Sequence, residues 1–275
     1  MKVALIQTRT PATHEAALAH VLPMVREAAA SGAAFIATPE GTNVLQKDRE
    51  ALLPMLRTLE DDVVVAALRA EAKAAGAWIL IGSALVKRED GKAANRSVLI
   101  SPAGEIAATY DKLHMFDVDL PTGETARESA TYEPGRAAVT AWAGDLKLGM
   151  TVCYDLRFPA LYRALALAGA EVMTIPAAFT RPTGAAHWEV LMRARAIETG
   201  SFVLAPAQGG KHEDGRGTWG HSLVVAPWGE VIAYLDHDEP GVLLADLDLT
   251  ASAKARAAIP ALANARPFSE PATLA

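Results

Sequence analysis

The feature of this sequence that most constrains its fold is a short pattern that occurs once in each half of the chain. Residues 32–39 and residues 169–176 both read Gly-Ala, then an apolar run, then proline, at a constant offset of 137 positions. An apolar run bounded by glycine and proline predicts a buried strand. Because an alanine-rich segment of helical spacing precedes each run, the repeat predicts two similar β-α halves.

Helical and strand patterns alternate along both halves. Helical spacing and end signals predict helices at residues 13–31, with Thr13 as N-cap and Gly32 as stop, and at 61–75, 159–168 and 185–199. Apolar runs predict strands at residues 2–8, 34–38, 78–86, 96–101, 105–110, 146–152, 171–175, 202–207, 221–226, 231–235 and 241–246. The glycine-rich residues 209–220 favour a flexible loop.

These elements predict an α/β fold in which two mixed sheets pack face to face with helices outside, a four-layer α-β-β-α sandwich. No Ser/Gly/Pro-rich linker separates the halves, so we expect residues 1–275 to form a single domain. We expect the proline-containing segment after Pro260 to be irregular and to fold over a neighbouring subunit.

Composition and charge exclude several classes of protein. Hydrophobic residues make up 51% of the 275 residues, enough for a core. The 26 Lys and Arg residues against 32 Asp and Glu give a net charge of -6, which argues against nucleic-acid or membrane partners. The N-terminal segment turns polar too early for a signal peptide, and the longest apolar run, Ala77–Val86, is too short for a membrane helix. We expect a soluble, cytoplasmic protein.

Cys153 is the single cysteine, which excludes an intramolecular disulfide and a multi-cysteine metal site. It follows a predicted strand and precedes a predicted helix, where α/β sheets place ligands and helix amides favour a thiolate. A lone cysteine is also most often an inert buried side chain. Position alone therefore leaves both interpretations open.

Two further residues complete a set suited to acyl transfer. Glu40 closes the matching strand of the first half, either as a cap or as a partly desolvated general base, and Lys112 lies in a polar run that otherwise favours an exposed loop. A carboxylate can accept the proton of Cys153, and an ammonium can stabilise an oxyanion together with the backbone N–H after the nucleophile. His114 and His187 are weaker alternatives as bases. The histidines lack metal-ligand spacing and no phosphate-binding glycine motif occurs, so we expect no metal and no cofactor.

Three motifs resemble, in chain order, the glutamate, lysine and cysteine motifs of the nitrilase (carbon–nitrogen hydrolase) superfamily: Thr38–Glu40, Tyr110–Asp117 and Val152–Pro159. The resemblance covers nearly the whole chain. It implies a catalytic triad of Glu40, Lys112 and Cys153. It also implies that a second glutamate positions the lysine, for which Glu128 is favoured over Glu124 and Glu133. A homodimer or higher homo-oligomer, built on the helices at 159–168 and 187–199, is implied as well.

Residues 186–199, 207–212 and 219–229 resemble the branch of that superfamily that hydrolyses deaminated glutathione. The resemblance implies an amidase that attacks the terminal carboxamide of this small acidic substrate through a cysteine thioester and releases ammonia. One alternative is an ω-amidase acting on α-ketoglutaramate or related dicarboxylate monoamides. Another, from a different class, is a catalytically silent binding or scaffold member.

An acidic substrate requires a cation in its pocket. Arg157, four residues after the proposed nucleophile, is the first candidate and Arg181 is the second. Arg157 fits equally well as the buried ion-pair partner of Asp155 or Glu189. We expect Tyr154, through its backbone N–H, and Phe179, near Arg181, to complete the substrate-binding residues.

Overall fold

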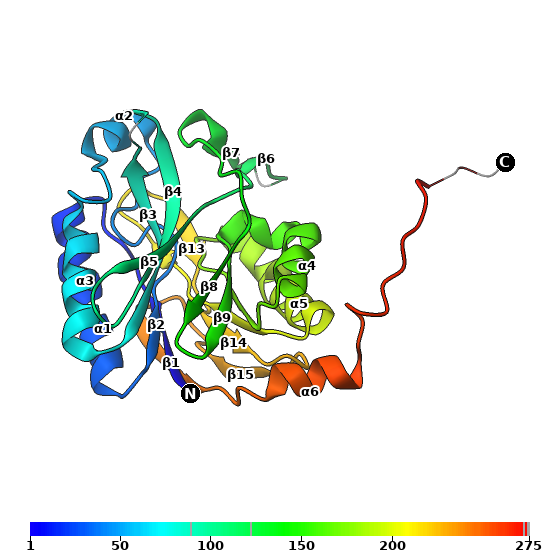
Figure 1. Ribbon diagram of the computed structural model, residues 1–275. Coiled ribbons are helices and arrows are strands. Elements are labelled where there is room, and N and C mark those ends of the chain that lie inside the picture. Colours follow the sequence, from blue (N-terminus) through cyan, green and yellow to red (C-terminus); the bar gives the residue numbers. More distant parts are fainter. Residues whose placement is uncertain (89, 122, 272, 274–275) are drawn as a thin grey trace.

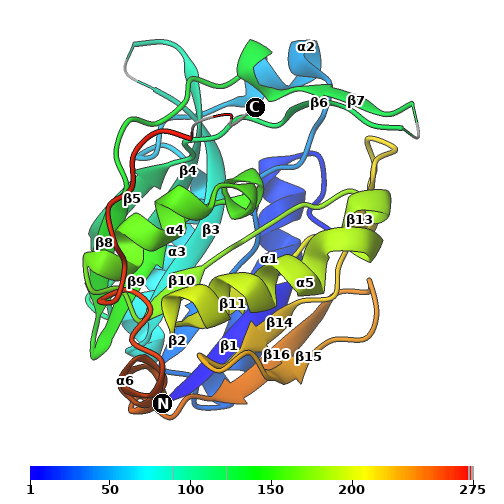
Figure 2. The same ribbon diagram turned by 90° about the vertical axis from the view of Figure 1, so that its right-hand side faces the viewer.

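Two six-stranded mixed sheets with matching strand order form the centre of the molecule (Figure 1, Figure 2). The computed structural model describes residues 1–88, 90–121, 123–271 and 273. In the first sheet the order is β16-β1-β2-β3-β4-β5: Gly241–Asp246, Lys2–Gln7, Phe35–Ala37, Trp78–Lys87, Ala93–Ile100 and Ile106–Asp111. In the second sheet the order is β15-β14-β11-β10-β9-β8: Val231–Tyr234, Leu223–Val225, Phe202–Ala205, Val172–Thr174, Leu146–Met150 and Val139–Ala143.

The repeat found in the sequence corresponds to equivalent strands of the two sheets. Strand β2 lies between β1 and β3 and is parallel to both, and β10 has the same relation to β9 and β11. The remaining pairs of each sheet are antiparallel, so the two halves share one topology.

Helices cover the outer face of each sheet. Helices α1 (His14–Ala30) and α3 (Val63–Ala75) pack on the first sheet, and α4 (Pro159–Leu167) and α5 (Arg181–Thr199) pack on the second. One buried apolar cluster joins the facing sides of the two sheets and the inner faces of α4 and α5. The predicted four-layer α-β-β-α sandwich is therefore confirmed.

Several helix ends follow from local chemistry. The side chain of Thr13 accepts a hydrogen bond from the Ala16 amide at 3.4 Å, as expected of an N-cap. Asp62 caps α3 in the same way, and Gly76 ends it in the left-handed conformation with φ 62°. Helix α5 begins four residues before the predicted start because Pro182 fits its first turn.

The prediction of a flexible loop at residues 209–220 is wrong. This segment forms the hairpin of β12 (Gly209–Lys211) and β13 (Gly217–Trp219). A Cβ on Gly209 would lie 2.3 Å from the carbonyl oxygen of Asp238, so this glycine allows close packing of two backbones.

Further elements were not predicted from the sequence, because they are short or lack strong periodicity. They are α2 (Arg49–Leu52), η1 (Leu53–Met55), β6 (Asp117–Asp119), β7 (Thr125–Arg127), η2 (Glu128–Ala130), β8 (Val139–Ala143), η3 (Cys153–Arg157) and α6 (Ala251–Ala258). After α6 the described residues form no helix or strand, and the chain runs away from the body (Figure 1). No helix among the described residues is long and apolar enough to cross a membrane.

Candidate active site

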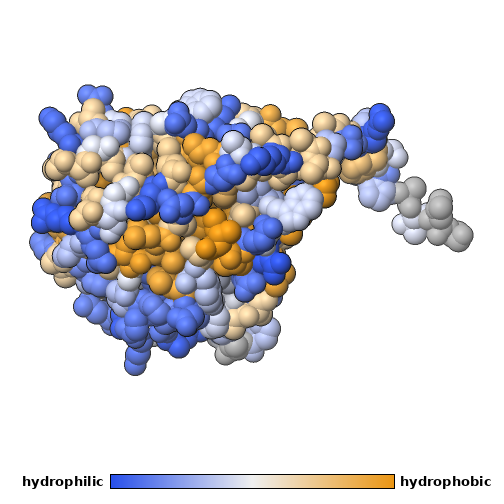
Figure 3. Space-filling view, turned by 90° about the horizontal axis from the view of Figure 1, so that it is seen from below, coloured by the Kyte–Doolittle hydropathy of each residue, from blue (hydrophilic) through white to orange (hydrophobic). Residues whose placement is uncertain are grey.

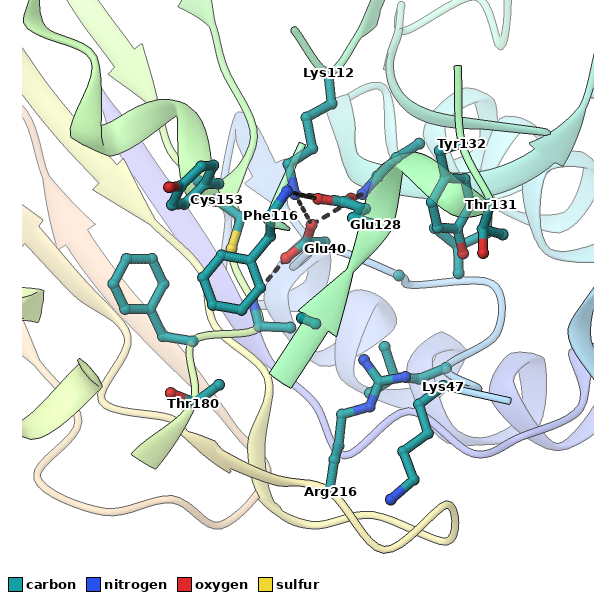
Figure 4. Close-up of a pocket in the computed structure, with 18 of the residues that line it drawn as sticks. Glu40, Lys47, Lys112, Phe116, Glu128, Thr131, Tyr132, Cys153, Thr180 and Arg216 are labelled. Atoms are coloured by element: carbon teal, nitrogen blue, oxygen red, sulfur yellow. Dashed lines mark hydrogen bonds and ion pairs between the residues drawn. The ribbon is translucent and has the colours of Figure 1, made fainter. Parts of the chain in front are cut away.

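Four predicted catalytic residues line one cavity of about 330 Å³ (Figure 4). Glu40 lies three residues after β2, and Lys112 directly follows β5. Glu128 begins η2, and Cys153 begins η3 after β9. The fold thus brings together side chains from four separate segments of the sequence.

Lys112 is the centre of this group, with a side chain that is 2% exposed. Its Nζ lies 3.0 Å from Oε1 of Glu40 and 2.9 and 2.8 Å from the two carboxylate oxygens of Glu128. An ammonium group has three donors, and these contacts occupy them. Of the three glutamates considered from the sequence, Glu128 is the one that contacts the lysine, whereas Glu133 pairs with Lys92 on the surface.

Asn95, on β4, also belongs to the site and was not identified from the sequence. Its Nδ2 donates to Oε1 of Glu40 at 2.9 Å and to Oε1 of Glu128 at 3.1 Å. The backbone carbonyl of Asn95 accepts from the Lys112 amide at 2.9 Å. One asparagine therefore fixes both carboxylates and the start of the lysine segment. No sequence motif marks it, because a lone asparagine in an apolar strand has many possible roles.

Cys153 adopts an unusual backbone conformation. Its φ is 50°, in the left-handed region that non-glycine residues rarely occupy. The amide of Cys153 donates to the carbonyl of Pro176 at 2.9 Å, which holds this turn in place. The sulfur faces Glu40 (Figure 4), close enough for the thiol to interact with its carboxylate. Strain of this kind, held by surrounding contacts, is typical of functional positions.

The surroundings fix the protonation states at rest. Burial and the adjacent charge of Glu40 raise the pKa of the Cys153 thiol well above its ordinary value, although Lys112 opposes this. Burial alone would raise the pKa of Glu40, but the Lys112 charge and several hydrogen bonds outweigh it and lower the pKa. Burial alone would lower the pKa of Lys112, but Glu128 and Glu40 hold it well above its usual range. The resting site thus contains a thiol, a carboxylate and an ammonium.

Asp155 connects the lysine segment to the cysteine turn. Its buried carboxylate accepts from the Tyr110 hydroxyl at 2.7 Å, from the His114 amide at 3.1 Å and from the Val152 amide at 2.8 Å. The His114 ring nitrogen Nδ1 also lies 2.7 Å from it. A single carboxylate thereby sets the position of Lys112 relative to Cys153, which explains the contribution of His114 without a role as base.

Three of the four predicted substrate-binding residues line the cavity: Tyr154, Arg157 and Phe179. Arg157 pairs with neither Asp155 nor Glu189. Its guanidinium lies 5.6 Å from the centre of the Phe179 ring and 3.3 Å from Nδ1 of His187. The backbone N–H of Tyr154 lies at the start of η3, where amides have no partner within the turn.

The expectation for Arg181 needs correction. Its side chain is 55% exposed and forms an ion pair with Asp238. It is not among the residues that line the cavity. The sequence placed it close to Phe179, but α5 begins at Arg181, so the guanidinium turns outward along the first turn of the helix.

The cavity instead contains basic residues that the sequence did not indicate: Lys47, Arg127 and Arg216. They lie in loops or in a short hairpin strand, far apart in the sequence, so no spacing connects them. Among the described residues, no group of three or more His, Cys, Asp or Glu side chains is arranged to hold a metal ion.

Comparison with known proteins agrees with this geometry. A curated relative from Homo sapiens, named deaminated glutathione amidase, is 40% identical over 251 residues, which cover 89% of this chain and 76% of the relative. The NitFhit protein of C. elegans superposes with a TM-score of 0.90 and 29% identity, covering 96% of this chain and 65% of that chain.

A third similar protein is a glutamate-to-glutamine variant of the amidase from Nesterenkonia sp. AN1. It is 26% identical with a TM-score of 0.80, covering 97% of this chain and 94% of that chain. In that structure the acetamide moiety of fluoroacetamide is bound covalently to the active-site cysteine. The carbon-nitrogen hydrolase family model matches residues 2–257. The chain therefore belongs to the carbon-nitrogen hydrolase family.

Proposed function

We propose that this protein is an amidase that hydrolyses deaminated glutathione, with Glu40, Lys112, Glu128 and Cys153 as its catalytic residues. The observation that carries the proposal is the contact of these four side chains, from four segments, inside one cavity. The name of the human relative supports the choice of substrate. An intact, mutually bonded group argues against a catalytically silent scaffold protein.

In the first half of the reaction, Glu40 accepts the thiol proton as the Cys153 sulfur attacks the amide carbon. This proton transfer neutralises Glu40, and the Lys112 donor that faced it becomes available to the oxyanion, beside the Tyr154 backbone N–H. Glu40 then passes the proton to the amide nitrogen, the C–N bond breaks, and the amine leaves. A thioester on Cys153 remains.

In the second half, Glu40 accepts a proton from water as the water oxygen attacks the thioester carbon. The proton then returns to the sulfur, the C–S bond breaks and the carboxylic acid leaves. Glu128 binds the Lys112 ammonium, and Asn95 donates to the carboxylates of both Glu40 and Glu128. These contacts keep Lys112 and Glu40 in place throughout the reaction.

The structure of the proposed substrate corrects the expectation of a terminal carboxamide that releases ammonia. In glutathione the side-chain carboxyl of glutamate is joined to the nitrogen of cysteinylglycine, and deamination changes only the glutamate amine to a ketone. The amide is thus a secondary one, and its hydrolysis releases cysteinylglycine. α-Ketoglutaramate has the same acyl group but releases ammonia, so the product amine distinguishes the amidase from the alternative ω-amidase.

We assign Arg157 to the carboxylate of the acyl group. It lies on the same 3-10 turn as Cys153, and Phe179 supports its guanidinium from one side. The acyl carboxylate is only four bonds from the amide carbon, or about 5 Å, so its partner must lie close to the nucleophile. Tyr154 and Phe179 complete this wall of the cavity.

We further propose that the chain acts as a single domain in a cytoplasmic homo-oligomer. The outer faces of α4 and α5 expose Leu167, Val190 and Ile197 at 58%, 69% and 56%. More apolar side chains gather on the face seen from below (Figure 3). Exposed apolar patches of this kind are typical of subunit interfaces. Size-exclusion chromatography of the wild type and of Val190→Asp tests this, with a shift towards monomer expected for the variant.

The catalytic assignment is tested by mixing the enzyme with deaminated glutathione and measuring cysteinylglycine. The wild type is expected to release it, and intact-mass measurement after acid quenching is expected to find the acyl group on Cys153. Cys153→Ala is expected to lose essentially all turnover and the adduct, because no other nucleophile replaces the sulfur. Substantial release of cysteinylglycine by Cys153→Ala would refute the assignment.

A further inference from the structure

A second basic region lies in the same cavity, on the side away from the catalytic lysine. Lys47, from the loop after β2, and Arg216, from the turn between β12 and β13, both line it. In Figure 4 they lie together below the group formed by Glu40, Lys112 and Cys153. Nothing in the catalytic steps above uses these two residues.

The position of Arg216 is fixed by a buried carboxylate. Asp214, with a side chain that is 1% exposed, accepts from Nε of Arg216 at 2.8 Å and from the Arg216 amide at 3.0 Å. The two terminal nitrogens of the guanidinium have no hydrogen-bond partner among the residues that the structure describes. Arg216 thus has a fixed orientation and a free pair of donors, the geometry that binds a carboxylate in a bidentate manner.

The same aspartate also holds the Lys47 segment. Oδ2 of Asp214 accepts from the Lys47 amide at 2.8 Å, so one carboxylate joins the loop after β2 to the β12–β13 turn. The Lys47 ammonium lies over this turn, 3.7 Å from the point where a Cβ on Gly215 would be. Two positive side chains against one negative one leave this end of the cavity with a net charge of about +1.

The other arginines of the cavity are engaged elsewhere. Arg127 donates to both carboxylate oxygens of Asp119 at 2.8 and 2.9 Å and to two backbone carbonyls. Arg157 lies next to Cys153 against Phe179, where the acyl carboxylate is expected. Arg216 and Lys47 therefore remain for an anion farther from the nucleophile.

This arrangement matters because two candidate substrates form the same thioester. Deaminated glutathione and α-ketoglutaramate have identical acyl groups, so an enzyme can discriminate between them only through the leaving group. Cysteinylglycine ends in a carboxylate, two residues beyond the scissile nitrogen, which places it about 7 Å away. Ammonia has no such group.

We propose that Arg216 and Lys47, joined by Asp214, form a subsite for the terminal carboxylate of a peptide leaving group. The subsite selects amides of short carboxylate-ended peptides over primary amides. This inference rests on the proposed function, because it assigns the part of the cavity that the amine half of the substrate occupies.

The test changes the enzyme and the substrate together. We would measure kcat/KM on deaminated glutathione and on an analogue whose glycine carboxylate is a carboxamide. Removing the carboxylate is expected to lower kcat/KM of the wild type about 10- to 100-fold, the range for charge-assisted hydrogen bonds. In Arg216→Gln, kcat/KM for deaminated glutathione is expected to fall by a similar factor. Its kcat/KM values for deaminated glutathione and for the carboxamide analogue are expected to differ less than about threefold.

Further variants separate recognition from folding, since Arg216→Gln leaves the buried Asp214 without its ion-pair partner. Arg216→Lys keeps a cation there and is expected to recover part of the lost activity. Lys47→Gln is expected to lose about three- to fivefold on deaminated glutathione, because its charge is exposed. The matched control is Lys211→Gln, which removes one exposed charge from the same hairpin outside the cavity and is expected to change nothing.

The outcomes are distinct. If the wild type cleaves deaminated glutathione well but treats the carboxamide analogue equally, or if Arg216→Gln loses the same factor on both, this inference is wrong and the proposed function stands. If the wild type cleaves deaminated glutathione no better than α-ketoglutaramate, this inference is wrong. If it releases no cysteinylglycine from deaminated glutathione at all, the proposed function falls as well.

Discussion

The catalytic end of the cavity and its basic end, formed by Lys47 and Arg216, are built in opposite ways. At the catalytic end the side chains lie just beyond strand ends, are buried, and satisfy one another, as the 2% exposure of Lys112 shows. At the basic end the side chains come from irregular loops, and Arg216 keeps 27% of its surface exposed. The charges at the catalytic end are paired with one another, whereas the basic end has positive charge available for a ligand.

The difference suggests a division of tasks. A buried group of opposite charges is destabilised strongly when one member is removed, so the catalytic end has little freedom to vary. At the basic end the exposed Lys47 can be altered at small cost in stability, whereas Arg216 both neutralises the buried Asp214 and keeps two donors free for a ligand.

Lys112→Met is expected to have the largest effect. It removes the positive charge that pairs with both Glu40 and Glu128, and an uncompensated buried charge costs about 3–5 kcal/mol of unfolding free energy. Turnover is expected to fall below detection, because the main oxyanion donor is lost as well. Urea denaturation and cysteinylglycine release measure the two effects.

The control for this change is Lys92→Met: the Lys92 side chain is 58% exposed, and its ammonium pairs with Glu133. Its loss is expected to cost at most about 1 kcal/mol and no activity. Equal destabilisation by the two variants would show that the catalytic end is not held together by its charges.

Asn95→Ala is expected to have the next largest effect. It removes the donor that bridges Glu40 and Glu128, and hydrogen bonds to charged groups of this kind are expected to be worth about 10- to 100-fold in kcat. KM is expected to change little, because Asn95 holds catalytic groups in place. Steady-state kinetics on deaminated glutathione separate the two constants.

Asn43 offers a matched control. It is also buried and donates to a carboxylate, that of Asp62 at 2.7 Å, but it does not line the cavity. Asn43→Ala is expected to lower stability and leave kcat unchanged. If both variants lose stability and neither loses kcat, Asn95 has only a structural role.

The same contrast explains what could be predicted from the sequence. Glu40 and Cys153 each follow a predicted strand, and three motifs in a fixed order pointed to one superfamily, so the fold and the catalytic end were accessible. Asn95 was missed because an asparagine inside an apolar strand carries no pattern of its own. Lys47 and Arg216 were missed because only the folded chain brings their loops together on Asp214.

Arg181 shows the converse error. Closeness in sequence to Phe179 suggested a substrate contact, but the direction of a side chain depends on where a helix begins. The hairpin at β12–β13 was missed for a related reason. Its many glycines favour a flexible loop on sequence grounds, whereas in the fold the absent side chain of Gly209 allows another segment to approach.

The pH dependence of kcat/KM tests whether the catalytic groups keep their resting protonation states across the neutral range. The pKa of Glu40 is lowered from 4.5, by the Lys112 charge and hydrogen bonds that outweigh burial, so kcat/KM is expected to fall only below that pH. Burial and the Glu40 charge raise the pKa of Cys153 above 9.0, so the thiol keeps its proton up to that pH. Between pH 5.5 and 8.5 we expect kcat/KM to vary less than about threefold.

Stability is expected to follow the same signs. Glu40 stabilises the fold above pH 4.5, and this contribution disappears as the pH falls through its lowered pKa. Lys112 and Cys153 have raised pKa values, so their contributions are full below 10.5 and 9.0 and decline as the pH rises beyond those values. Thermal melting across pH measures this. For activity, a rise or fall of kcat/KM near pH 6 to 7 would instead indicate a titrating group outside the four catalytic residues.

The smallest expected effect is that of salt, and it separates the two ends most directly. Exposed charges are screened over a Debye length of about 10 Å at 0.1 M salt, whereas buried pairs are screened much less. Raising the salt from 0.05 to 0.5 M is therefore expected to raise KM for deaminated glutathione about two- to threefold and to leave kcat within about 20%. With the carboxamide analogue the rise in KM is expected to be smaller, because Arg216 and Lys47 then face no anion. A parallel fall in kcat would mean that salt screens the catalytic charges too. The contrast between a closed and an open end of the cavity would then not hold.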